Sequence, residues 1–169
     1  MWLHTARTSH IASKIVGVLV ESKDIETDSR QEVQLDVEAV LNQYIRDEQA
    51  ISEKARDMLA ARGLPSGELG RIRKLVAEQR KVKIGEDAID YLLDQLVEML
   101  MHSANVDEVY APDVEMRRKM RTFLRAEMDA DVQLQTEVRQ QLRHVREGTS
   151  VWEVEYQRMM QDIRRRKGL

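Results

Sequence analysis

The chain has 169 residues, of which 34% are charged and 4% aromatic, and its formal net charge at pH 7 is −3. This length suits one ordinary domain or two very small ones, and it can bury a core without help from a disulfide or a metal. Cysteine is absent, which excludes disulfides, thiolate zinc sites and cysteine nucleophiles. Glycine and proline are few, with 7 and 2 residues, while good helix formers such as Leu, Ala, Glu and Arg are abundant. We therefore predict an all-α protein.

No apolar run approaches the roughly 20 residues that cross a bilayer. The strongest apolar block, Ile15 to Val20, is also too short for the apolar core of a secretory signal, and no small-residue cleavage site follows it. We therefore expect a cytoplasmic protein that makes no membrane contact.

Apolar residues recur at helical spacing through the first half of the chain. They predict a first helix from about Ser9 to Ser22, followed by a polar loop from Lys23 to Ser29. A long helix then carries the apolar residues from Val33 to Leu59. Gly63 suits the position just after a helix end, where glycine adopts a left-handed conformation easily. A short helix is predicted from about Gly67 to Lys81.

The same order of elements begins again at Gly85, where the next helix is predicted to start. A loop from His102 to Pro112 and a second long helix from Val114 to Leu142 follow. The last helix is predicted to begin at Ser150, because Ser150 and Glu153 have the spacing of a capping box.

Residues of the two halves correspond at an offset of 81 through the first helix and the loop behind it. Ile15 to Val20 falls on Leu96 to Met101, and Asp24 falls on Asn105. A period of about eighty residues is longer than that of the familiar two-helix solenoid units. We therefore predict a duplication with repeats at residues 1–83 and 84–169, each of about three helices, packed about an approximate two-fold axis.

Two stretches carry a resemblance to a known family. They are Ile84 to Leu100 and Glu147 to Tyr156, the latter with Arg164 to Gly168 behind it. They resemble the bacterial family of unknown function numbered 507, whose tandem form would cover the whole chain. The resemblance implies a bacterial, cytoplasmic, helical protein, and it implies no activity, cofactor or catalytic residue.

The sequence contains none of the common motifs of catalytic or metal sites. No two of the four histidines stand at the three- or four-residue spacing of a helical metal site. No Glu-x-x-His, glycine-rich phosphate loop or nucleophile elbow occurs. We predict no metal, no cofactor, no small-molecule substrate and no enzymatic activity. A carboxylate-based enzyme stays an alternative, because any two of the 30 acids can meet in the fold.

Each predicted repeat ends in a basic helix. Residues 65–83 hold six Lys or Arg against two acids, and residues 157–169 hold five against one. Such segments can contact a phosphate backbone, or they can pair with the acidic residues of the same molecule. The candidate phosphate contacts are Arg71, Arg73, Lys74, Arg164, Arg165, Arg166 and Lys167.

Trp152 and Tyr156 lie one helical turn apart and share a face. They can anchor a partner, since Trp and Tyr dominate binding hot spots, or they can pack the last helix onto the long one. Long charged helices without catalytic motifs favour an interaction or scaffold protein that binds a protein partner or a second copy of itself. Nucleic-acid binding through the basic helices is the alternative function.

Overall fold

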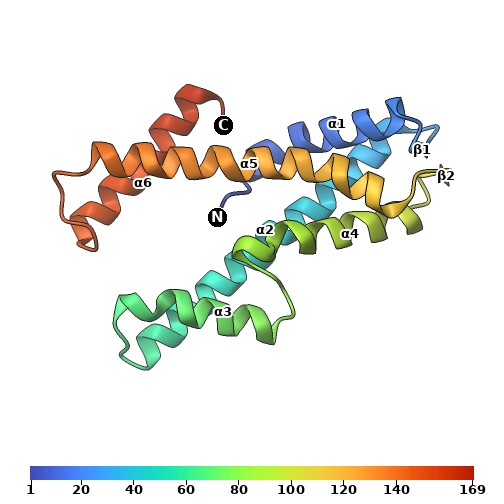
Figure 1. Cartoon of the computed structure of the whole chain (residues 1–169). Coiled ribbons are helices and arrows are strands. Elements are labelled where there is room, and N and C mark those ends of the chain that lie inside the picture. The colour runs from blue at the N-terminus through green and yellow to red at the C-terminus, as the bar shows by residue number, and fades with distance from the viewer. The chain divides into compact units, whose positions relative to one another are not determined.

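The computed structural model describes all of residues 1–169 (Figure 1). It contains six α-helices, two single 3-10 turns and one pair of two-residue strands, so the predicted all-α class is confirmed. In chain order the elements are α1 (Thr5–Glu21), β1 (Ile25–Glu26), α2 (Arg30–Ala61), η1 (Ser66–Glu68), α3 (Leu69–Gln79), η2 (Gly85–Asp87), α4 (Ala88–His102), β2 (Glu108–Val109), α5 (Asp113–Gln141) and α6 (Ser150–Lys167).

The chain forms two compact units. Unit 1 comprises Met1 and Leu3–Leu124, and unit 2 comprises Trp2 and Arg125–Leu169, so α5 contributes residues to both. Unit 1 therefore combines residues of both predicted repeats. The order of helix, short strand, long helix and final helix occurs twice, once before and once after residue 84, although α3 has 11 residues and α6 has 18. The repeat boundaries concern sequence similarity, and they stay a prediction.

The long helix α2 organises unit 1, because it contacts α1, α3 and α4 (Figure 1). Its apolar residues follow the spacing of a single helical face, as do those of the neighbouring helices. Burying each such side chain contributes about 1.5–3 kcal/mol of transfer free energy. Residues exposed by 1% or less include Ile11, Ile15, Leu19, Val37, Leu41, Leu92, Leu96, Leu100, Met116 and Met120.

The two loops predicted as irregular contain the strands β1 and β2, which pair antiparallel with Ile25 opposite Val109. Each loop supplies hydrogen-bond partners to the other. The Asp107 amide donates to the Glu26 carbonyl at 2.8 Å, and the Thr27 hydroxyl donates to the Asn105 carbonyl at 2.6 Å. The pairing was not predictable from the loop sequences, because two residues give no alternation of apolar and polar side chains.

Three helices of unit 1 end in a left-handed residue. Gly63, with φ 59°, follows α2 as predicted. Lys23 and Lys81, with φ 59° and 57°, hold the corresponding places after α1 and α3. In each case the next residue's amide closes back on the helix, as when the Val82 amide donates to the Ala77 carbonyl at 3.0 Å. Lysine carries no sequence signature of this conformation, so two of these ends were found only in the structure.

Unit 2 packs the second part of α5 against α6 around a small apolar cluster. The N-cap of α6 is Thr149, whose hydroxyl oxygen accepts a hydrogen bond from the Trp152 amide at 3.2 Å. The predicted cap at Ser150 is therefore wrong by one residue, because Ser150 already has helical geometry. No helix of the chain combines the length and the apolar character needed to cross a bilayer. The cluster consists of Leu134, Val138, Leu142, Met160 and Ile163.

Candidate functional site

The first group of predicted phosphate contacts lies on α3. Arg71 pairs with Glu68 at 2.6 Å on the surface, and Arg73 pairs with the buried Glu48 of α2 at 3.1 Å. Lys74 is exposed and forms no ion pair. Two of these three cations are therefore held by carboxylates of their own unit.

The second group lies at the end of α6. Arg164 donates to Asp131 of α5 at 2.6 Å, and Lys167 donates to Glu137 of the same helix at 2.5 Å. The other two arginines bond to the preceding turn, where Arg165 pairs with the Asp162 carboxylate at 2.7 Å and Arg166 donates to the Asp162 carbonyl at 3.4 Å. Pairing within the molecule, the alternative that the sequence left open, accounts for most of the basic residues.

The buried acids of the chain all have basic partners. Glu48 is matched by Arg73, Asp131 by Arg164, and Asp24 by Lys119 of α5 at 2.6 Å. Two buried carboxylates without a cation, the arrangement that raises a carboxyl pKa for acid catalysis, do not occur among them.

Trp152 and Tyr156 stack on each other with their ring centroids 4.8 Å apart. Both are half-buried and lie against the apolar cluster of unit 2. The Arg139 guanidinium stands 6.0 Å from the Tyr156 ring, and burial raises the pKa of the Tyr156 phenol. The structure places this predicted partner anchor where it joins α6 to α5.

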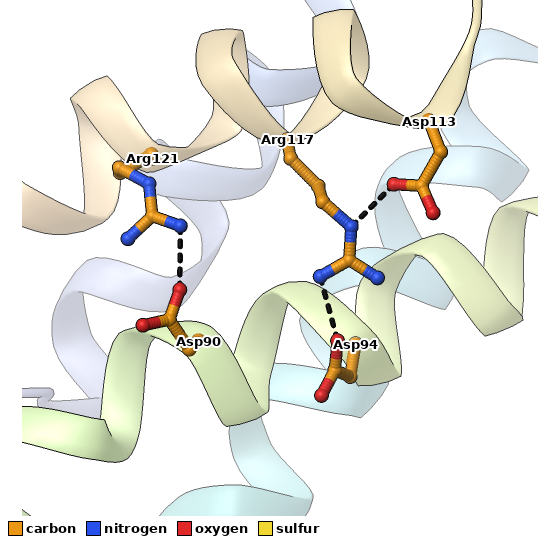
Figure 2. Close-up of polar contacts among 5 residues, drawn as sticks. All are labelled: Asp90, Asp94, Asp113, Arg117 and Arg121. Carbon is orange, nitrogen blue, oxygen red and sulfur yellow. Dashed lines mark hydrogen bonds and ion pairs between the residues drawn. The ribbon is translucent and has the colours of Figure 1, made fainter.

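A row of ion pairs links α4 to the start of α5 (Figure 2). Arg117 contacts both Asp94, at 2.6 Å, and Asp113. Arg121, one turn after Arg117 on α5, pairs at 2.5 Å with Asp90, one turn before Asp94 on α4. The carboxylates are largely exposed, so each pair contributes about 1 kcal/mol or less. This row occupies one face of α4, and Leu92 and Met99 lie on the opposite face of the helix.

That opposite face forms a groove with α2, which we call the α2–α4 groove. A hollow of about 350 Å³ lies between the two helices. Its lining residues recur at one-turn spacing on each helix, as expected of two facing helical stripes. From α2 they are Asp36, Ala39, Val40, Gln43, Tyr44 and Asp47, and from α4 they are Tyr91, Leu92, Gln95 and Met99.

The floor of the α2–α4 groove is apolar and fixed. Leu92 is fully buried, and Tyr44 is only 2% exposed. The Tyr44 hydroxyl donates to the Lys83 carbonyl at 3.2 Å, and its ring lies 6.0 Å from that of Tyr91 in a tilted arrangement. Burial raises the pKa of both phenols, with the Asp47 carboxylate adding to the effect at Tyr91. Both phenols are therefore neutral at physiological pH.

A second hollow, of about 440 Å³, continues the groove toward the end of α4. The two hollows share Asp36 and Met99 as lining residues. Asp36 is held at this junction by Ser103 and Asn105, whose side chains donate to its Oδ2 at 2.6 and 2.9 Å. The groove thus has a rigid carboxylate in its middle and another, Asp47, at one end.

Sequence reasoning did not single out the α2–α4 groove. The spacing of Val40, Tyr44 and Tyr91 predicts that they face inward on their helices. From the sequence of one helix alone, however, an inward-facing residue is assigned to the hydrophobic core. Which helix lies opposite, and how far away, depends on tertiary packing. No signal in the sequence gives that distance.

A comparison with curated proteins gave no match. The sequence model of the family described as "Protein of unknown function (DUF507)" matches residues 1–169, which is the whole chain. The resemblance seen in two stretches of the sequence therefore extends over both units. The chain belongs to the DUF507 family of proteins of unknown function.

Proposed function

We propose that the chain is a non-enzymatic helical interaction protein that binds a protein partner through the α2–α4 groove. The observation that supports this proposal is the groove itself. It has an apolar floor and an open rim formed by the exposed residues Ala39, Gln43 and Gln95. Met99 and Tyr91 line its walls while half-buried. Flexible Met and rigid Tyr side chains are suited to forming apolar contacts with a partner.

The test compares two variants that place the same bulky side chain on α2. Ala39→Trp fills the groove from its rim, whereas Ala60→Trp adds an indole to an exposed site near the end of the helix, outside the groove. Tagged wild-type chain and both variants are used for affinity capture from native lysate, with and without nuclease. We expect wild type and Ala60→Trp to capture the same protein partners, and Ala39→Trp to lose them. Nuclease treatment should not remove these partners. Equal capture by all three chains would contradict the proposal.

Nucleic-acid binding stays the second candidate, supported by a different set of cations, of which only Lys74 was among the phosphate contacts predicted from the sequence. Lys74 on α3 and Arg80, Lys81 and Lys83 just behind it are exposed and form no ion pairs. Neutralising a phosphate-contacting lysine lowers the slope of log affinity against log salt by about 0.7–0.9. Lys81→Gln and Lys83→Gln are the variants to compare with wild type on single- and double-stranded DNA and RNA. An unchanged slope would remove this candidate.

We further infer that the chain arose by tandem duplication and works in the cytoplasm of a bacterium. The recurring order of elements supports the duplication. So do two ion pairs in which an acid of a long helix holds an arginine of the following helix: Glu48 with Arg73, and Asp131 with Arg164. A structure-based alignment of residues 1–83 with residues 84–169 tests the duplication, and subcellular fractionation tests the location.

A further inference from the structure

We propose that the partner segment bound by the α2–α4 groove is a cationic amphipathic helix, with apolar residues facing the floor and a Lys or Arg facing each of the two groove carboxylates. This inference rests on the function proposed above and names the chemistry of the partner. It follows from the charge, the length and the lining of the groove.

The lining of the groove contains carboxylates and no Lys or Arg. Asp36 and Asp47 are the charged residues that line the first hollow. The second hollow adds His102, which pairs with the Glu98 carboxylate at 3.2 Å. The nearest cation on α2, Arg46, is exposed and donates to Gln43 at 2.7 Å, outside the lining. A groove with carboxylates and no Lys or Arg selects a positively charged occupant.

Asp47 is available to such an occupant. Its Oδ1 accepts a hydrogen bond from Gln43 at 3.0 Å, while its Oδ2 has no donor in the chain. Asp36 accepts two hydrogen bonds at its Oδ2, which hold the carboxylate in place, while its Oδ1 has no donor in the chain. Each of the two carboxylates therefore has one oxygen that can accept a hydrogen bond from a cationic partner.

The part of the groove between its two carboxylates fits a short helix. Asp36 and Asp47 are eleven residues apart on α2, which corresponds to roughly 16 Å along the axis, or about three turns. An occupant helix of the same length has cations at both ends and two or three apolar residues between them, at one-turn spacing. Apolar residues of this spacing meet the half-buried side chains of Val40, Tyr91 and Met99 in the groove lining, as in other cases of a helix bound in a groove.

The experiment selects peptides from a random 14-residue display library on the intact chain. Each enriched peptide is then tested on wild type, on Ala39→Trp and on Ala60→Trp. Peptides that bind wild type and Ala60→Trp but not Ala39→Trp occupy the groove. We expect these peptides to carry Lys or Arg about three turns apart with apolar residues between them. A second blocking variant, Gln95→Trp, tests the groove from its other wall if Ala39→Trp lowers the helix content measured by circular dichroism.

The charge is tested with one matched pair of variants. Asp47→Asn removes the groove carboxylate without changing its size, and Asp57→Asn removes an exposed carboxylate of the same helix outside the groove. We expect Asp47→Asn to weaken binding of the selected peptides about three- to fivefold in a fluorescence anisotropy titration at low salt, and Asp57→Asn to leave it unchanged.

The outcomes separate this inference from the proposed function. The cationic nature of the partner would be refuted if the groove-dependent peptides were neutral or acidic, or if they bound Asp47→Asn as tightly as wild type. Either result would still support the groove as a binding site. A selection without any groove-dependent peptide would also overturn the inference. The proposed function would then be decided by the capture from lysate, which assumes nothing about the charge of the partner.

Discussion

Arg73 of α3 donates to Glu48 of α2 at 3.1 Å, and the side chains are 30% and 6% exposed. The pairing is incomplete, because Glu48 Oε2 and Arg73 Nε are buried without a hydrogen bond. The buried acid of unit 2 is better satisfied, since Asp131 accepts both from Arg164 and from Gln135, at 2.6 Å each. A cation that the sequence offered for phosphate binding is thus held within the protein's own fold.

Replacing Arg73 is predicted to lower the free energy of unfolding more than replacing Glu48. Arg73→Met leaves the buried Glu48 carboxylate unpaired and should lower the free energy of unfolding by about 2–3 kcal/mol. Glu48→Gln should cost only about 1 kcal/mol, since the half-exposed Arg73 can still reach water. Urea unfolding measures both values. Arg71→Met, which removes a surface pair, is the control and should cost less than about 0.5 kcal/mol; a larger cost for Glu48→Gln than for Arg73→Met would refute the argument.

Tyr44 should make the stability of the fold fall at high pH. Burial raises the pKa of its phenol, so the folded chain keeps this proton above pH 10, where the unfolded chain loses it. Its contribution is complete below pH 10 and is lost as the pH rises, at about 1.4 kcal/mol per pH unit. Tyr44→Phe should cost about 1 kcal/mol at neutral pH, through the hydrogen bond to the Lys83 carbonyl, and should have a flatter profile. The free energy of unfolding of wild type and of Tyr44→Phe is measured from about pH 9 to 11. The same pH dependence in both proteins would show that Tyr44 does not cause the loss of stability.

Replacing Lys81 by glycine should stabilise the protein. Lys81 has a φ of 57°, which strains any residue with a Cβ by about 1 kcal/mol. Lys81→Gly relieves this strain but makes the unfolded chain more flexible, so we expect a net gain of about 0.5 kcal/mol. Lys83→Gly, in the same loop at an ordinary φ, should instead lose about 0.5 kcal/mol. Thermal unfolding distinguishes the two, and a loss of stability in Lys81→Gly would show that the strain is small.

Trp152 is expected to matter for folding rather than for binding. Trp152→Ala removes its stacking on Tyr156 and its contact with the apolar cluster of unit 2, and should cost about 2–3 kcal/mol. Trp152→Phe keeps an aromatic ring and should recover about half of this loss. Both variants should capture the same partners as wild type from lysate at a temperature where they remain folded. Loss of a partner in a folded Trp152→Ala chain would restore the anchor function suggested by the sequence.

The sequence by itself determined the helices of this protein. Apolar spacing defined α2, α4 and α5 to within a few residues, and Gly63 marked the end of α2, because a helix and its glycine stop depend on local backbone energetics. Composition predicted the all-α class, because residues with high helix propensity are abundant and glycine and proline are few. The left-handed lysines and the Thr149 cap were missed, since lysine is unusual in that conformation and Ser, the neighbour of Thr149, is the more strongly preferred cap residue.

Only the tertiary structure decided which residues meet. It paired Arg73 and Arg164 with acids of the preceding long helix, joined β1 to β2, and brought the stripes of α2 and α4 together as a groove. These partners lie tens of residues apart in the chain, and their contact depends on how helices cross and how far apart they pack. A charge pattern shows that a cation is present, but whether it reaches a ligand or a carboxylate of its own fold depends on distances that exist only once the helices have packed.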